Sequence, residues 1–296
     1  MTLEAAFYRF LYLKQLQGCS DKTVSCYQQV LLPFIKFVGD IPLTDLSREN
    51  HNEYIYLLTQ RKYSRATFAS YVRQLKVFIR WLESEYHLSL ESEKLKVPVA
   101  HRRVVHIFSD GEIIDLFDSI EASPEWIRLR NCAMVALMLD SGLRQNEVAC
   151  LRSEDIYWSS GTLKVLGKGA KERVVPFGCF SRDFMKMYRE QCPYSDEYFF
   201  VDRHGGVLTA DAVKHFMHKL SDKLPFDVSS HRLRHNFATN YCLNQYEKYG
   251  TIDLYRLMIL MGHEDIETTR IYLHHANQII ASVSAISHLD KILRNK

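Results

Sequence analysis

The segment over residues 65–86 constrains the fold of this 296-residue chain more than any other part, because its apolar side chains recur every three or four positions. That spacing places them along one face of a helix, and a helix with one apolar face must bury it against other elements. Ser64 precedes the segment as a plausible N-cap, since its hydroxyl can accept a hydrogen bond from a free N–H of the first turn. The apolar positions are Phe68, Tyr71, Val72, Leu75, Phe78, Ile79 and Leu82.

Three more helices are predicted before residue 90, over residues 3–17, 21–38 and 48–61, so the N-terminal part should form a four-helix unit. After Glu91 the pattern lapses into a stretch of mixed charge that contains Pro98, which is typical of a linker. A chain of this length usually forms two domains. We therefore expect an N-terminal domain over residues 1–92, a linker over 93–107 and a second domain over 108–296.

The second domain should be mainly helical with a small antiparallel sheet. Ser109 and Glu112 have the spacing of a capping box at a helix start, and an apolar helix over 128–141 should stop at Gly142. Between residues 161 and 176, two short β-branched or apolar runs flank a Gly-Lys-Gly turn, which predicts a β-hairpin. Helical periodicity returns after residue 209 and continues to the end.

The positive charge of the chain is concentrated in its N-terminal part. Residues 1–107 hold 15 Lys and Arg against 10 Asp and Glu, whereas residues 108–296 hold 23 against 25. Basic side chains that lie opposite the apolar face of the 65–86 helix could bind DNA phosphates, and a merely solvated surface explains them as well. These candidates are Arg65, Arg73, Lys76 and Arg80.

The cysteine pattern and the N-terminus favour a cytoplasmic protein. The seven cysteines never occur as Cys-x-x-Cys, so neither a disulfide framework nor a zinc ribbon is expected. The N-terminus lacks the features of a signal peptide, and the longest apolar run, over 132–139, is much shorter than a membrane span. We expect a soluble protein with no contact to a membrane.

Five clusters of Arg, His, Lys and Tyr in the second domain carry the chemical signal, at residues 141–147, 167–173, 231–235, 261–263 and 268–274. In this order they resemble the active-site motifs of the tyrosine recombinases, the phage integrase family that includes the Xer recombinases. That resemblance implies a SAM-like core-binding domain of four helices followed by a mostly helical catalytic domain. By the same resemblance, the catalytic residues are Arg144, Lys168, His231, Arg234, His263 and Tyr272.

The chemistry of strand cleavage requires these residue types. Attack on a phosphodiester without a metal places negative charge on the non-bridging oxygens, and the guanidinium groups of Arg144 and Arg234 suit those oxygens. A tyrosine with a pKa of about 10 needs a proton acceptor at neutral pH, and His231 can serve as one for Tyr272. The resemblance implies that Lys168 protonates the leaving 5′-oxygen. It also implies that His263 binds a non-bridging oxygen.

Several residues near these clusters are candidates for supporting roles in the site. Glu147, one turn after Arg144, could orient the active-site cations, although an exposed i,i+3 pair is an equally good interpretation. Lys171 and Arg173 follow the hairpin tip and are candidates for DNA contacts. Thr268 and Thr269 fit an N-cap before the helical turn that bears Tyr272.

Other interpretations of these residues, such as metal binding, nucleotide binding or packing, are mostly weaker than the catalytic one. His231 and His235 have the spacing of a zinc-binding helix, but Arg232 and Arg234 would repel the ion, so we expect no metal and no cofactor. The hairpin tip lacks the complete phosphate-binding loop motif, and a plain turn is the serious alternative there. The remaining histidines should be surface or core residues, namely His204, His215, His218, His274, His275 and His288.

The resemblance implies a site-specific recombinase that cleaves and rejoins double-stranded DNA through a 3′-phosphotyrosyl intermediate. Four protomers, identical or paired with a paralogue, would act on two sites through a Holliday junction. The C-terminal tail over 276–296 would dock on a neighbouring protomer or pack on its own chain. The segment over 242–253 is longer than in compact Xer-like members. Relaxation of DNA in the manner of a type IB topoisomerase, a non-catalytic DNA-binding regulator and a metallohydrolase are the competing functions.

Overall fold

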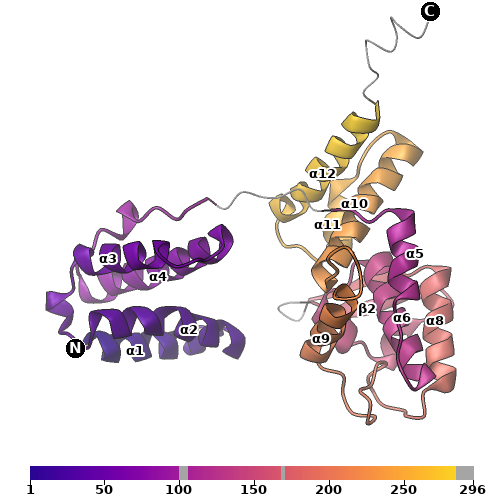
Figure 1. The fold of residues 1–296 in the computed structure, drawn as a ribbon, viewed down its shortest axis with the longest axis horizontal. Coiled ribbons are helices and arrows are strands. Elements are labelled where there is room, and N and C mark those ends of the chain that lie inside the picture. The colour runs from indigo at the N-terminus through magenta and orange to yellow at the C-terminus, as the bar shows by residue number, and fades with distance from the viewer. Residues whose placement is uncertain (100–105, 168–170, 285–296) are drawn as a thin grey trace, which may run out of the picture. The chain divides into compact units, whose positions relative to one another are not determined.

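The computed structural model describes residues 1–99, 106–167 and 171–284, and the chain divides into two compact units, Met1–Arg103 and Val104–Lys296 (Figure 1). We call them the first and the second unit. Each has its own buried apolar core.

The first unit is a small helical bundle. It consists of α1 (Leu3–Leu16), α2 (Asp21–Val38), α3 (Arg48–Thr59) and α4 (Arg65–Tyr86), with short 3-10 turns η1 (Leu43–Asp45) and η2 (Ser92–Lys94). The four predicted helices are confirmed, with ends that differ by two residues or fewer. The predicted N-cap is also confirmed, because Ser64 Oγ accepts a hydrogen bond from the Thr67 N–H at 3.1 Å.

Aromatic side chains fill the centre of this bundle. The rings of Phe7, Phe10, Phe34 and Phe78 are fully buried, and those of Phe10 and Phe78 meet edge to face with centroids 5.2 Å apart. The predicted apolar face of α4 supplies much of this core. Burial of that face leaves the opposite side of α4 free to carry charge.

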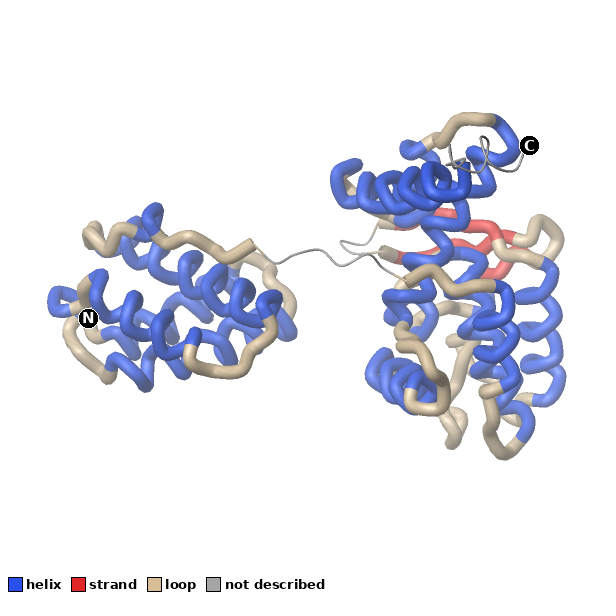
Figure 2. The backbone as a smooth tube through the Cα atoms, turned by 45° about the horizontal axis from the view of Figure 1, so that its top comes forward, coloured by secondary structure: helices blue, strands red, loops and turns tan. Residues whose placement is uncertain are grey.

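The second unit is mainly helical and includes one small sheet (Figure 2). Ser109 caps α5, and the predicted capping box is confirmed by a 2.8 Å hydrogen bond from its N–H to Glu112 Oε2. Before and within the sheet, the elements are α5 (Asp110–Asp118), α6 (Glu125–Ser141), α7 (Gln145–Ala149), η3 (Ser153–Asp155), β1 (Ile156–Tyr157), β2 (Thr162–Leu166) and β3 (Glu172–Pro176). After it come α8 (Cys179–Gln191), α9 (Ala210–Ser221), α10 (Ser230–Tyr249), α11 (Leu254–Met261) and α12 (Ile266–Ser284).

The three strands form an antiparallel sheet in the order β1-β2-β3, which contains the predicted hairpin. The register pairs Leu163 with Val175 and Val165 with Arg173. Leu163, Val165 and Val175 are buried in the core of the second unit. Arg173 lies on this same inner face of the hairpin, opposite Val165.

Helix α6 is buried on nearly all sides and organises the second unit. Helices α8 and α10 pack against it, and α12 packs against α10 and α11 (Figure 1). Gly142 ends α6 with φ +61°, and an added Cβ would lie 2.3 Å from a ring carbon of Phe237. Only glycine fits both that conformation and that space.

The long segment over 242–253 forms the end of α10 and the loop to α11, with Gly250 as a left-handed C-cap. None of the described helices is long and apolar enough to cross a membrane.

Candidate active site

Arg144 lies at the N-terminus of α7, where the carboxylate of Glu147 orients it. The Arg144 N–H donates to Glu147 Oε2 at 2.7 Å, and Arg144 Nη1 donates to Oε1 at 2.9 Å. Arg144 Nη2 also reaches the carbonyl of Gly262 at 3.0 Å, so the side chain joins α7 to the turn after α11. The Glu147 side chain is only 3% exposed, which excludes the interpretation as an exposed helix pair.

Arg173 shares this carboxylate, and its position corrects our expectation of an exposed DNA contact. Its Nη1 and Nη2 donate to the two oxygens of Glu147 at 2.7 and 2.8 Å, and its Nε donates to the Leu260 carbonyl at 2.8 Å. The side chain is 8% exposed, because Arg173 lies on the inner face of β3 opposite Val165. Alternation from the buried Val175 agrees with this position, although the pairing of the strands, rather than the sequence, shows which of the two adjacent valines is buried.

Glu147 is held as a carboxylate by these two arginines. Burial raises its pKa, but the hydrogen bonds and charge of Arg173, followed by the hydrogen bonds of Arg144, outweigh burial and lower the pKa to about 2. The group is therefore negative at any physiological pH.

Arg234, on α10, is almost fully buried. Its Nη1 donates to the Gly142 carbonyl, while its Nη2 donates to the Met261 carbonyl and contacts His263 Nε2 at 3.2 Å. Burial and the charge of Arg144 lower its pKa to about 10, so it stays charged at neutral pH. Arg234 also forms a side-chain hydrogen bond with Tyr272, and the five N–H donors of a guanidinium suffice for such a set of partners.

His263 follows the left-handed residue Gly262, which ends α11. Arg234 can only donate, so His263 Nε2 accepts, and the ring proton must sit on Nδ1. That nitrogen lies 2.8 Å from Thr269 Oγ1, which accepts the hydrogen bond. Burial and the charges of Arg234 and Arg144 lower the pKa of His263 to about 4, which keeps the ring neutral.

The N-cap role predicted for Thr268 and Thr269 is wrong. Helix α12 already begins at Ile266, and the Glu267 N–H donates to Asp265 Oδ1 at 2.9 Å. Aspartate is itself a preferred residue at helix starts, and this signal was available in the sequence. Thr269 instead fixes the tautomer of His263, because its hydroxyl accepts the hydrogen bond from Nδ1.

Tyr272 is on α12 and is 3% exposed. Its ring meets the His235 ring edge-on, with centroids 4.9 Å apart, and lies nearly parallel to the His263 ring at 6.2 Å. Burial raises the pKa of Tyr272, although the charges of Arg234 and Arg144 act in the opposite direction. The phenol is thus protonated at neutral pH and requires a proton acceptor to react.

His231 lies in the first turn of α10, after Ser229, whose hydroxyl caps the helix by accepting the Arg232 N–H at 3.2 Å. Its Nε2 is 2.9 Å from His235 Nε2, so the pair expected to resemble zinc ligands is hydrogen-bonded internally. Burial and the charge of Arg234 lower the pKa of His231. Across the described ranges, no group of three or more His, Cys, Asp or Glu side chains is placed to hold a metal ion.

Lys168 lies outside the described residues, which include both flanks of its hairpin tip. The Gly167 N–H donates to the Lys171 carbonyl at 2.8 Å and closes the base of the tip. Lys171 Nζ forms an exposed ion pair with Glu264 at 2.7 Å, next to His263. This ion pair connects the start of the second hairpin strand to the turn that contains His263.

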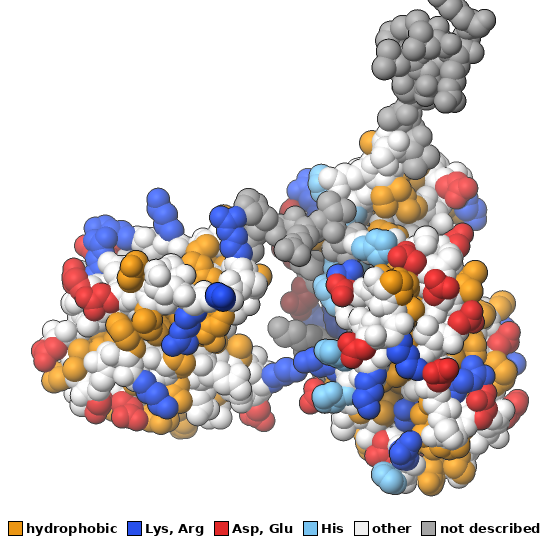
Figure 3. All heavy atoms as spheres, viewed as in Figure 1, with side chains coloured by type: hydrophobic (Ala, Val, Ile, Leu, Met, Phe, Trp, Pro, Cys, Tyr) orange, Lys and Arg blue, Asp and Glu red, His pale blue; other side chains and the backbone are white. Residues whose placement is uncertain are grey.

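The predicted phosphate contacts of the first unit differ in exposure. Arg65, Arg73 and Arg80 are exposed on α4, and Figure 3 shows lysine and arginine side chains on the face of this unit turned to the viewer. Lys76 is half-buried, with its Nζ donating to the Leu95 carbonyl at 2.6 Å. The three arginines are therefore better placed than Lys76 to meet a polyanion.

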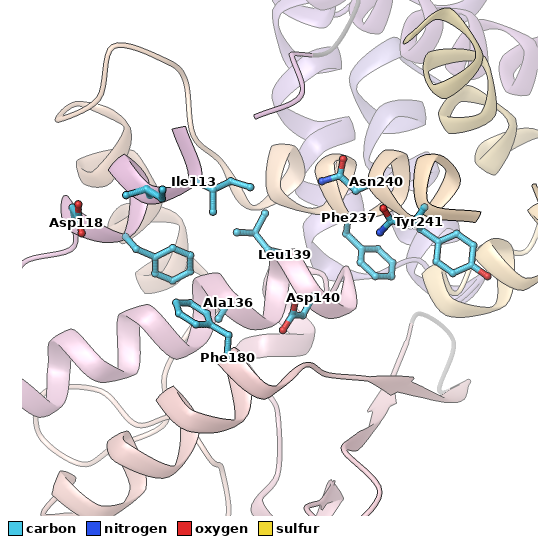
Figure 4. A pocket seen from close by; sticks show the side chains of 12 residues that line it. Ile113, Asp118, Ala136, Leu139, Asp140, Phe180, Phe237, Asn240 and Tyr241 are labelled. Carbon is cyan, nitrogen blue, oxygen red and sulfur yellow. The ribbon is translucent and has the colours of Figure 1, made fainter. Parts of the chain in front are cut away.

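The second unit also has a mostly apolar hollow of about 700 Å³ between α5, α6, α8 and α10 (Figure 4). Its lining includes Ile113, Leu139, Phe180 and Phe237, and none of the five predicted catalytic residues that the structure describes is part of that lining. The candidate active site is therefore the polar cluster around Arg234, away from this hollow.

Comparisons with known proteins find matches to both units of the chain. The model of the phage integrase family matches residues 108–278, and the model of the phage integrase N-terminal SAM-like domain matches residues 7–88. Tyrosine recombinase XerC of Pediococcus pentosaceus is 30% identical over 278 residues, covering 89% of this chain and 90% of that protein. Tyrosine recombinase XerD of Oceanobacillus iheyensis is 28% identical, covering 90% and 92%.

A solved structure, that of a lambda integrase tetramer bound to a Holliday junction, has the same fold. It covers 90% of this chain and 78% of its own, with a TM-score of 0.71 and 19% sequence identity.

Proposed function

The chain belongs to the phage integrase family and is a tyrosine site-specific recombinase that breaks and rejoins DNA, and from this premise we propose that Tyr272 is its nucleophile. One observation carries the proposal. Tyr272 is buried between His235 and His263, beside the charges of Arg234 and Arg144, in a cluster assembled from α7, α10, α11 and α12. The residues that act with it are Arg144, Lys168, His231, Arg234 and His263.

The arginines stabilise the negative charge that develops at phosphorus. Arg234 is fixed by two backbone carbonyls, and Arg144 is fixed by Glu147 and the Gly262 carbonyl. Their remaining N–H donors are therefore oriented before DNA arrives. Loss of one such preorganised donor typically slows a reaction by about 10²–10³-fold.

Proton transfers complete each half of the reaction. Tyr272 gives its proton to His231, and its oxygen attacks phosphorus to form a 3′-phosphotyrosyl bond. The 5′-oxygen leaves with a proton from Lys168. The bond energy stays in the phosphotyrosyl linkage, so rejoining by reversal of the same steps needs no ATP, cofactor or metal.

Double-stranded DNA is the partner of both units in this proposal. The exposed arginines Arg65, Arg73 and Arg80 on α4 supply phosphate contacts from the first unit, and Lys171 supplies one from the hairpin. Contacts to phosphates fix the position of the protein and carry no sequence information directly.

We propose a tetramer as the acting form, with two sites exchanging strands through a Holliday junction. The similar lambda integrase was solved as a tetramer on such a junction, and in our proposal the four protomers are identical or are paired with a paralogue. The tail over 276–296 is a candidate for contacts between protomers. Only its part up to Ser284 lies within the described residues.

A nicked suicide substrate, on which a cleaved strand cannot be rejoined, tests the nucleophile. Tyr272→Phe should bind this DNA with unchanged affinity and form no covalent complex on a denaturing gel. Tyr255→Phe is the matched control, because Tyr255 is 61% exposed on α11 and should react as the wild type does. A covalent complex formed by Tyr272→Phe would remove Tyr272 from this role, and cleavage that EDTA abolishes and zinc restores would favour a metallohydrolase.

A further inference from the structure

His235 lies one helical turn after His231 and is only 5% exposed. The two Nε2 atoms are 2.9 Å apart, and the rings meet edge to face at 80°. Two N–H groups facing each other at that distance would repel, and so would two lone pairs, so one proton must lie between them. The tautomers of the two rings are therefore coupled.

The same ring touches the proposed nucleophile. The centroids of His235 and Tyr272 are 4.9 Å apart, with an interplanar angle of 63°. His235 thus contacts both the side chain that gives the proton and the side chain proposed to receive it.

The contact decides which nitrogen of His231 can react. Its Nε2 is engaged with His235, so Nδ1 is the nitrogen left to take the tyrosine proton. Nδ1 can accept only when the proton of His231 sits on Nε2. In that state His231 donates through Nε2 to His235 Nε2, and His235 carries its own proton on Nδ1.

The surroundings of His235 support a hydrogen bond in which His231 donates and His235 accepts. Within the described part of the chain, His235 Nδ1 and Thr239 Oγ1 are both buried without a hydrogen-bond partner, and they are four residues apart on α10. Residues at that spacing are neighbours on a helix, and a hydroxyl can accept from an N–H. A side-chain rotation of Thr239 would therefore satisfy both atoms.

We propose that His235 is a positioning residue that holds the His231 imidazole in the tautomer able to take the proton of Tyr272. The inference rests on the roles proposed above for His231 and Tyr272. The proton moves from the Tyr272 hydroxyl to His231 Nδ1 as the tyrosine oxygen attacks phosphorus. His231 keeps its Nε2 proton throughout, and the resulting imidazolium donates it to His235.

His235 must stay neutral to accept that bond. Burial and the neighbouring His231, His275, Arg234 and Arg232 lower its pKa to about 4. Arg232 and Arg234 face it from α10, and Tyr272 and His275 face it from α12. All of these groups are retained in the variants below, so a change in pH dependence can be assigned to residue 235.

The test compares His235→Phe, which keeps the ring shape, with His235→Gln, whose amide oxygen can accept from His231. Cys242→Ala is the matched control, since Cys242 is buried on the same helix and in the same apolar cluster as Tyr272. Full-length proteins are assayed for DNA affinity and for the single-turnover rate of covalent complex formation on the suicide substrate between pH 5 and 9.

We expect His235→Phe to bind DNA as the wild type does and to react roughly 10–100-fold more slowly, a smaller loss than the ~10²–10⁴-fold that a general base contributes, because His231 itself is retained. The rate should rise with pH as His231 loses its proton. Without the acceptor, the imidazolium is less stable, so this rise should move to lower pH in His235→Phe. His235→Gln should recover most of the rate and the wild-type pH profile, and Cys242→Ala should match the wild type.

Two outcomes would overturn the inference. One is a His235→Phe protein with the wild-type rate and pH profile. The other is an equal loss in the Phe and Gln variants with the wild-type pH profile, which indicates a packing role only. Should His235→Phe not fold, Thr239→Val replaces it, because loss of the Nδ1 acceptor should also slow the reaction, and an unchanged rate would contradict the inference.

Tyr272→Phe in the same assay separates this inference from the proposed function. If Tyr272→Phe forms the covalent complex, the proposed nucleophile is wrong. If Tyr272→Phe is inactive while His235→Phe is unaffected, only the positioning role is wrong.

Discussion

Glu147 binds Arg173 through both carboxylate oxygens, at 2.7 and 2.8 Å, in a pair that is almost completely buried. The same carboxylate also holds Arg144, and the two arginines donate to the carbonyls of Leu260 and Gly262. One acidic side chain thereby connects strand β3, helix α7 and the turn before His263. Arg144 is oriented through this network rather than by its own packing.

Removal of the Glu147 charge should destabilise the second unit in a pH-dependent way. A carboxylate whose pKa falls from 4.5 to about 2 on folding adds stability that is fully present above pH 4.5 and is lost as pH falls toward 2. The shift corresponds to about 3 kcal/mol. Glu147→Gln should lower the free energy of unfolding by roughly that amount at pH 7, measured by urea unfolding. Below pH 4.5 the free energy of unfolding of this variant should also depend less on pH.

Glu125→Gln is the control for this experiment. Glu125 also pairs with an arginine three residues away, but both side chains are substantially exposed, and such surface pairs contribute at most about 1 kcal/mol. Equal losses for the two variants would show that burial of the Glu147 network contributes no stability.

The fold was largely predictable from the sequence because helix signals are local. The apolar spacing and the caps at Ser64 and Ser109 identify elements within a few residues along the chain. The burial of Arg173 was harder to predict, because Val174 and Val175 are both apolar and leave the alternation of β3 ambiguous. Only the pairing of Arg173 with Val165 resolves which face is buried.

The residue types of the site were readable, whereas the links between them were not. Glu147 and Arg173 are 26 positions apart, and the link between Thr269 and His263 depends on where α12 starts. The spacing of His231 and His235 fits either a zinc pair or a hydrogen-bonded pair, and only their facing Nε2 atoms identify the second. Such links arise from tertiary packing, to which no local pattern corresponds.

The hydroxyl of Thr269 should matter for cleavage although it touches no DNA in the proposed mechanism. Thr269→Val removes the acceptor at 2.8 Å from His263 Nδ1, and the neutral ring can then place its proton on either nitrogen. We expect the single-turnover cleavage rate to fall about tenfold, less than the ~10²–10³-fold loss typical when a preorganised donor is removed, because His263 itself is retained. Thr268→Val, at an exposed position of the same helix, should keep the wild-type rate, and equal rates for both variants would exclude the role.

The exposed arginines of α4 should contribute to the salt dependence of DNA binding. Replacement of Arg65, Arg73 and Arg80 by Gln should reduce the slope of log affinity against log salt by about 0.9 for each DNA phosphate that the variant no longer neutralises. Arg9→Gln is the control, because Arg9 is also exposed in the first unit but is paired with Glu85 at 2.7 Å. A triple variant with the slope of the wild type would show that this face of α4 does not meet the DNA backbone.

Lys168 should be separable from the arginines by the chemistry of the leaving group. If Lys168 protonates the 5′-oxygen, Lys168→Ala should slow cleavage of ordinary DNA but largely spare a substrate in which sulfur replaces the bridging 5′-oxygen, because a thiolate leaves without a proton. Arg144→Ala should be slow on both substrates, since the guanidinium neutralises non-bridging oxygens that the sulfur substitution retains. Neither substitution removes a group of the backbone hydrogen bond between Gly167 and Lys171 that closes the base of the hairpin, so the comparison isolates the ammonium. If Lys168 made only a generic contact to the DNA backbone, Lys168→Ala would slow both substrates equally, and that result would reject the assignment as general acid.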